Sequence, residues 1–446
     1  MTIRRLAVAA AFVSLSFHGA MANGTWVGAW GFTTLPQPPG MRLQGAPPQM
    51  PPSIPPLDSN VAVAQSITQP PPPMGQPILD NPGNVPLVLT GTNGIGNTTI
   101  RQLARVSASG KEIRLRLSNE DGSDALVLGA VHVGMAGPDG AVLPGSDHIV
   151  TFDGHPAISI PAGAPLLSDP VNLPVTALDR IAISIYVPGP VRSRGHDLWQ
   201  YVAAAPGDTA AQPQLAGVRL APLTALVTEI DVNATTAGNT VVTLGDSITE
   251  GAESTANAFR SWPDRLAERL APNGKWSVVN VGIGGNRLLR YGAGPNALAR
   301  FDRDVLSVPG VKIVILLEGI NDIGRGFSPA NAPEPVTAEA LEAADKQIIA
   351  RAHARGVRVI GATLTPYEGA GYFDPKGEEI REAVNHWILT GGAFDGVADF
   401  AAATADPAHP TNFRSDYNLS DHLHPNDAGY RAMGDAIDLK LITAGR

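Results

Sequence analysis

The sequence predicts two folded domains, a β-sandwich or jelly roll followed by an α/β domain with a parallel sheet. From Thr98 to about Val202, short strand-like runs are separated by Gly, Pro, Asn and Asp, which is typical of a sandwich. After Val241, strand-like runs alternate with helical patterns over short connections, which predicts a parallel sheet covered on both faces. The length of 446 residues also favours two domains, because one hydrophobic core rarely grows that large.

Residues 1–22 have the pattern of a signal peptide. The pair Arg4-Arg5 precedes an apolar run at 6–17, and Ala20-Met21-Ala22 is a small-residue cleavage site. The run is too short to span a bilayer comfortably, so a retained membrane anchor is the weaker alternative. We therefore expect a secreted or periplasmic protein with no membrane span after the leader is removed. Both general and twin-arginine export stay open.

The composition excludes several kinds of function. A net charge of -9 argues against a nucleic-acid partner, because phosphates are neutralised by basic side chains. The chain contains no cysteine, so it has no disulfide, no thiolate nucleophile and no zinc site built on thiolates. Its stability must therefore come from core burial, for which the chain is long enough.

The segment 23–97 begins with a short aromatic strand, Gly24 to Trp30, and then becomes rich in proline at 36–86. Proline fixes φ and removes a backbone donor, so this stretch is expected to be irregular or polyproline. A linker, a wrapping arm and a lid are all compatible with it, and a passive arm or loop is the preferred interpretation.

The segment 98–235 forms the β-rich domain and its linker. Glu112 to Leu117 alternates polar and apolar residues, as a half-buried strand does. Further strands are expected at 126–133, 157–160 and 181–187. Trp199 and Tyr201 alternate on a late strand, where they could bind a sugar, but strand aromatics more often pack in a core.

The segment 236–446 forms the α/β domain. Strands are expected at Val241–Leu244, Ser277–Val281, Val311–Leu317, Val357–Thr363 and Gly396–Phe400. Helices are expected from Trp262 to Leu270, from Thr337 to Arg355, from Glu378 to Leu389, and from near Pro425 past Ile437.

The first of these strands ends in Gly245-Asp246-Ser247, where a serine follows a glycine at the carboxyl end of a strand. Open α/β sheets place their chemistry at that edge, which makes Ser247 a candidate nucleophile. An ordinary turn is the alternative, since Gly, Asp and Ser are common turn residues.

Two more strands are followed by stretches suited to the same edge. Asn280 to Asn286 is a glycine-rich loop with uncovered amides, but its glycines are too closely spaced for a dinucleotide loop. Glu318-Gly319-Ile320-Asn321-Asp322 places an amide side chain where it can donate into a site, although a lone Asn is more often a turn residue.

The last stretch is Asp421-His422-Leu423-His424-Pro425. A carboxylate three residues before a histidine can bond Nδ1 and leave Nε2 as a base, the arrangement of a Ser-His-Asp triad. A metal site on Asp421, His422 and His424 is the alternative, but no further ligand stands out in the sequence. We expect the segment to be extended, with Pro425 fixing the direction of His424.

These four stretches together resemble the blocks of the SGNH, or GDSL, hydrolase superfamily, over roughly residues 238–446. The resemblance implies a three-layer α/β/α, flavodoxin-like domain. It implies Ser247 as nucleophile, His424 as general base and Asp421 as its orienting acid. The implied oxyanion hole consists of the amides of Ser247 and Gly285 and the side chain of Asn321. No cofactor or metal is expected.

Trp262-Pro-Asp264, Gly285 to Leu289 and Glu318 to Asp322 also resemble secreted bacterial arylesterases and acylhydrolases associated with xylan degradation. The expected function is therefore a secreted serine esterase that deacylates small esters or O-acylated plant polysaccharide. Two alternatives stay open. One is a lipase or arylesterase of broad specificity, and the other is a non-catalytic carbohydrate-binding protein that keeps the fold.

Overall fold

The computed structural model describes residues 25–34, 96–189, 201–222, 226–236, 238–327 and 334–444. The predicted leader, the proline-rich segment and Trp199 lie outside the described residues. Within the described ranges, no helix has both the length and the apolar character needed to cross a bilayer.

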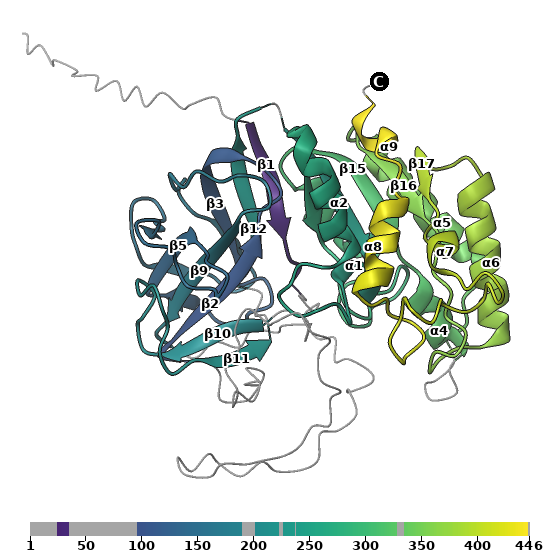
Figure 1. The fold of residues 1–446 in the computed structure, drawn as a ribbon, viewed down its shortest axis with the longest axis horizontal. Helices are drawn as coiled ribbons and strands as arrows, with labels where there is room; N and C mark the ends of the chain where they lie inside the picture. The colour runs from purple at the N-terminus through teal and green to yellow at the C-terminus, as the bar shows by residue number, and fades with distance from the viewer. Residues whose placement is uncertain are drawn as a thin grey trace, which may run out of the picture.

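The N-terminal part is a sandwich of antiparallel sheets (Figure 1). One sheet has the strand order β1-β12-β3-β8, and the other has the order β11-β10-β2-β9-β5-β6. The strands are β1 Thr25–Gly31, β2 Thr98–Arg105, β3 Gly110–Ser118, β4 Leu126–Leu128, β5 Ala130–Met135, β6 His148–Ile149, β7 Ile158–Ile160, β8 Pro165–Leu167, β9 Arg180–Val187, β10 Tyr201–Pro206, β11 Arg219–Pro222 and β12 Val227–Ala234. The fold class predicted for this region is confirmed.

The period-two pattern of β3 shows why these residues form a sandwich. Ile113, Leu115 and Leu117 are at most 1% exposed and point into the core between the sheets. One predicted strand is wrong, because the run 126–133 is divided at Gly129 between β4, which pairs with β7, and β5, which pairs with β9. A Cβ on Gly129 would lie 2.5 Å from the Tyr186 ring. The chain therefore passes from β4 to β5 at a residue that has no room for a side chain.

The C-terminal part is a three-layer α/β/α domain around the parallel sheet β14-β13-β15-β16-β17. Its strands are β13 Asn239–Gly245, β14 Trp276–Asn280, β15 Val311–Leu317, β16 Arg358–Ala362 and β17 Gly396–Ala398. Counted along the chain this is the flavodoxin-like order 2-1-3-4-5, so the resemblance predicted the architecture correctly. The order reverses between β13 and β15, and ligands bind at such a point outside the carboxyl ends of the strands.

Two groups of helices pack on this sheet (Figure 1). α2 contacts α8, which contacts α7, whereas α6 contacts α4 and α5. The helices are α1 Ser247–Glu250, α2 Trp262–Leu270, α3 Ala297–Phe301, α4 Ile320–Phe327, α5 Ala338–His353, α6 Pro375–Thr390, α7 Phe400–Thr404, α8 Asp427–Ala436 and α9 Lys440–Thr443, with a 3-10 turn at Ala271–Asn273 and a π turn at Asp302–Leu306.

Two predicted boundaries in this domain are wrong for local reasons. β17 ends at Ala398 rather than at Phe400, because the Asp399 side chain accepts from Ala402 and starts α7. The last long helix begins after Asn426, whose side chain accepts from two backbone amides, and it ends at Ala436 before Ile437. Side-chain capping, which depends on local geometry, therefore decides where β17 gives way to α7 and where α8 begins.

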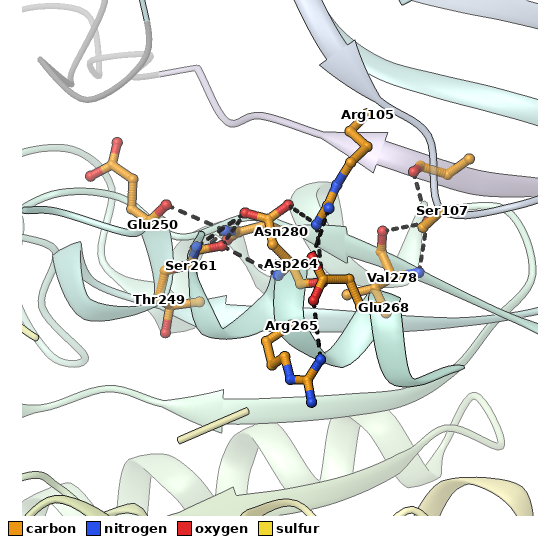
Figure 2. Close-up of polar contacts among 11 residues, drawn as sticks. Arg105, Ser107, Thr249, Glu250, Ser261, Asp264, Arg265, Glu268, Val278 and Asn280 are labelled. Atoms are coloured by element: carbon orange, nitrogen blue, oxygen red, sulfur yellow. Dashed lines mark hydrogen bonds and ion pairs between the residues drawn. The ribbon is translucent and has the colours of Figure 1, made fainter. Parts of the chain in front are cut away.

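The two domains are joined along β1, which comes before the proline-rich segment in sequence. β1 pairs with β12 on one side and packs against β14, the edge strand of the parallel sheet. A Cβ on Gly31 would lie 2.4 Å from a Val279 methyl, so the contact requires glycine there. Figure 2 shows Ser107 on the same edge, where its hydroxyl accepts from the Val278 amide and donates to the Val278 carbonyl, both at 2.9 Å.

An arginine and a phenylalanine extend the same interface. Arg105 of β2 forms ion pairs with Asp264 and Glu268 of α2 at 3.2 and 2.9 Å (Figure 2). The guanidinium groups of Arg105 and Arg180 both lie over the ring of Phe259, at 5.5 and 5.3 Å from its centroid. Phe259 belongs to the loop that follows α1, so the sandwich holds a segment close to Ser247 in the chain.

Candidate active site

The turn after β13 presents Ser247 at the carboxyl edge of the sheet. Gly245 must be glycine, because a Cβ there would lie 2.3 Å from the Leu317 carbonyl oxygen. Asp246 caps α1, with its carboxylate accepting from the Ile248 amide at 2.9 Å. Ser247 is therefore the first residue of a short helix and is 9% exposed.

His424 and Asp421 come from the loop between α7 and α8 and meet Ser247 there. His424 Nε2 lies 2.8 Å from Ser247 Oγ, and Nδ1 lies 2.5 Å from Asp421 Oδ2. The other carboxylate oxygen of Asp421 accepts from the amides of Leu423 and His424, each at 3.0 Å. The structure thus brings the three predicted residues into one hydrogen-bonded line.

The backbone around His424 differs from the extended segment that the sequence predicted. His422 has φ 58°, in the left-handed region, and its exposed side chain packs beside Gly369. The chain therefore folds back over Asp421 instead of alternating, and His422 and His424 do not point the same way. The prediction that favoured His424 over His422 had the wrong geometric reason.

The charge on Asp421 is favoured despite its partial burial. Burial raises its pKa, but hydrogen bonds from His424 and from two backbone amides outweigh that effect, and the pKa stays below its ordinary value. Asp421 is thus ionised at neutral pH and fixes the tautomer of His424 with the proton on Nδ1.

Gly285 and Asn321 lie on the neighbouring loops. Gly285 has φ 71°, a conformation that glycine adopts without strain. The Asn321 amide nitrogen donates to the Asn286 carbonyl at 3.0 Å and lies 3.4 Å from Asp246 Oδ2, whereas its oxygen accepts from the Tyr372 hydroxyl at 3.5 Å. These contacts fix the amide with its nitrogen toward Asp246 and the nucleophile turn.

Buried acids lie beneath these loops. Burial raises the pKa of Asp246 to about 6, and the Ile248 amide and His424 oppose the rise. Burial and the nearby Asp246 carboxyl raise the pKa of Glu318 as well. Asp322 accepts from the amides of Leu288 and Leu289 at 2.6 and 3.2 Å, which anchors the loop that carries Gly285.

Arg300 of α3 lies beneath these loops and links them, a role that no pattern in the sequence indicates. Its side chain is fully buried and donates to the carbonyl of Gly245 at 2.9 Å and to that of Val281 at 2.6 Å. It also donates to Asn286 Oδ1 at 2.9 Å, and Asp304 balances its charge. One guanidinium thus ties the end of β13 to the loop of Gly285.

We expect the Arg300→Met variant to lose at least about tenfold in kcat, since it leaves several buried acceptors unpaired at about 1–3 kcal/mol each. KM should change little, because Arg300 does not face the substrate, and Arg300→Lys should recover part of kcat. Arg269→Met is the matched control: Arg269 also donates to two backbone carbonyls, those of Gly434 and Ile437, but it holds α8. Steady-state kinetics with melting curves checks this, and equal kcat losses in both methionine variants would refute it.

The metal alternative has no geometric support among the described residues, where no three His, Asp or Glu side chains are grouped to hold an ion. Both ring nitrogens of His424 are already in hydrogen bonds with protein atoms. A neutral Nε2 facing a serine hydroxyl can act as a base, so the arrangement is suited to nucleophilic attack.

Part of the α/β domain is similar in sequence to a known protein family. Residues 243–432 match the model of the GDSL-like lipase/acylhydrolase family. No curated protein matches the sequence. Among solved structures, the chain is similar to a lipolytic protein of the G-D-S-L family from Desulfitobacterium hafniense, with 24% identity over 45% of this chain and 97% of that one, at a TM-score of 0.35.

Two further solved structures are similar to this chain at comparable identity and coverage. An acetyl-xylooligosaccharide esterase from a Geobacillus species is 23% identical over 46% of this chain and 96% of its own, at a TM-score of 0.37. A GDSL-like lipase from Bacteroides thetaiotaomicron is 20% identical over 46% of this chain and 89% of its own, at a TM-score of 0.33.

Proposed function

Residues 243–432 belong to the GDSL-like lipase/acylhydrolase family of the SGNH hydrolases, so the chain is a carboxylic ester hydrolase, and we propose that it works through an acyl-enzyme on Ser247. The observation that carries the proposal is the line from Asp421 through His424 to Ser247, with contacts of 2.5 and 2.8 Å. A base within hydrogen-bond reach of the nucleophile, itself oriented by a third group, is the requirement for this chemistry.

In the proposed mechanism, Ser247 Oγ attacks the ester carbonyl while His424 Nε2 takes its proton. The imidazolium is stabilised by the Asp421 carboxylate and then gives the proton to the leaving alcohol. Water, deprotonated by the same nitrogen, attacks the acyl-enzyme and releases the acid. Besides the ester and this water, both steps use only groups of the chain itself.

The negative charge of the tetrahedral intermediate would be held by the amides of Ser247 and Gly285 and by Asn321 Nδ2. Donors of this kind are fixed before charge develops, and loss of one typically costs about 2.7–4 kcal/mol of transition-state stabilisation. The 3.4 Å contact of Asn321 Nδ2 with Asp246 is the weaker of its two, so it is the one an oxyanion would replace.

For the substrate, we propose small esters or O-acylated plant polysaccharide, met outside the cytoplasm after removal of residues 1–22. The support is the sequence resemblance at Trp262-Pro-Asp264 and at Gly285 to Leu289. A lipase or arylesterase of broad specificity is the nearest alternative. Hydrolysis of p-nitrophenyl acetate, butyrate and longer esters, measured beside acetylated xylan, separates these possibilities.

A non-catalytic carbohydrate-binding role is the alternative of a different class. A fluorophosphonate probe tests it directly, because the probe labels only an activated serine. Labelling that disappears in the Ser247→Ala variant supports the esterase, whereas an unlabelled wild-type chain that binds xylan supports the binding protein.

Activity should survive EDTA, because the proposed steps use only side chains and backbone amides. The measurement is the rate with p-nitrophenyl acetate before and after dialysis against the chelator. A loss that added zinc restores would favour the metal site on Asp421, His422 and His424 instead.

A further inference from the structure

Arg325 lies beside the proposed oxyanion hole. Arg325 is on α4 one helical turn after Asn321, so the two side chains share a face of that helix. A Cβ built on Gly285 would lie 3.6 Å from the terminal nitrogen of Arg325. The guanidinium therefore reaches the loop whose amide we assign to the oxyanion.

Tyr372 is the aromatic residue next to this part of α4. Tyr372 packs its ring against Gly324, and its hydroxyl donates to Asn321 Oδ1 at 3.5 Å. Burial raises the pKa of Tyr372, and the nearby positive charge of Arg325 opposes the rise. Arg325 thus lies near Gly285, and its charge acts on Tyr372, whose hydroxyl bonds to Asn321.

The neighbouring arginines already have carboxylate partners. Arg287 pairs with Glu334 at 2.6 Å, Arg290 pairs with the same carboxylate at 3.3 Å, and Arg300 pairs with Asp304 at 3.2 Å. Arg325 is half-buried and forms no hydrogen bond or ion pair with any residue that the structure describes. Its nitrogens are not among the buried unpaired atoms in those ranges, so solvent and substrate can reach them.

We propose that Arg325 binds a carboxylate carried by the substrate, next to the scissile ester, and so makes the enzyme prefer anionic esters. The inference rests on the esterase function proposed above. A planar guanidinium donates two parallel hydrogen bonds to a carboxylate, and such charge-assisted bonds are about twice as strong as neutral ones.

The test compares matched esters by pH-stat titration. Ethyl butyrate and monoethyl succinate place the carboxylate on the acyl side, whereas phenyl acetate and 4-acetoxybenzoate place it on the leaving group. In one of these pairs, wild-type kcat/KM should favour the anionic member. Arg325→Gln should lower that preference at least about tenfold, mainly through KM, since a bond to a charged group is lost.

The controls separate this inference from the function on which it rests. Neutral esters should be hydrolysed by Arg325→Gln at nearly the wild-type rate, Arg325→Lys should keep part of the preference, and Arg290→Gln should keep all of it. The inference is overturned if wild type has no anionic preference in either pair, or if Arg325→Gln slows neutral and anionic esters equally. A wild-type chain inactive on all four esters would overturn the esterase function itself, and the inference with it.

Discussion

The Ser247→Ala variant should fold normally and lose at least about three orders of magnitude in ester hydrolysis, because the members of a catalytic triad act as a unit. The substitution removes only Oγ and its 2.8 Å contact with His424, and it keeps the backbone amide that starts α1. The residual rate would come from the oxyanion donors and substrate binding alone. The measurement is kcat/KM with p-nitrophenyl acetate, beside a thermal unfolding curve.

Ser254→Ala is the matched control for this variant. Ser254 lies in the turn after α1, where its backbone amide bonds to the Gly251 carbonyl and survives the substitution. It should retain nearly full activity. If Ser247→Ala stays active while its melting curve matches wild type, the nucleophile must be another residue.

The His424→Ala variant should lose turnover to a similar extent, whereas a change at His422 should have little effect. His424 is the residue whose ring joins Ser247 and Asp421, so its loss removes both the base and the group that Asp421 orients. His422 projects its exposed ring beside Gly369. Steady-state kinetics on the two variants measures the contrast.

For His422, asparagine is the better replacement. The residue has φ 58°, and asparagine tolerates that left-handed conformation better than alanine does. His422→Asn should therefore leave the loop around Asp421 in place and alter kcat by less than about threefold, as exposed substitutions usually do. A dead His422→Asn enzyme combined with an active His424→Ala enzyme would show that the triad assignment is wrong.

The residues near Ser247 were predictable because each follows a strand of a parallel sheet. Parallel strands bring their carboxyl ends to one edge, so the turns at Gly245, Gly285 and Asn321 had to meet once the alternation of strands and helices was recognised. The pairing of Gly245 with Leu317 in the sheet shows this convergence directly. The order of strands and helices along the sequence was therefore sufficient to predict that part of the site.

Arg300 and Arg325 were not predictable in the same way. The role of Arg300 depends on three acceptors, at Gly245, Val281 and Asn286, which are separate in sequence and meet only in the folded chain. Arg325 is notable for a missing partner among the described residues, which no spacing in a sequence can reveal. The left-handed conformation of His422 was not predicted either. It belongs to a turn that closes when the Asp421 carboxylate accepts a hydrogen bond from the Leu423 amide.

The position of β1 also determines when the protein can finish folding. Its partner β12 begins at Val227, so the first strand made must wait for most of the sandwich to be synthesised before it can pair. Its bond from the Gly28 amide to the Pro309 carbonyl forms later still. Closing so long a loop costs entropy before any contact compensates for it, which slows folding. Until β1 docks, β12 keeps an open edge, and such edges are sites of aggregation.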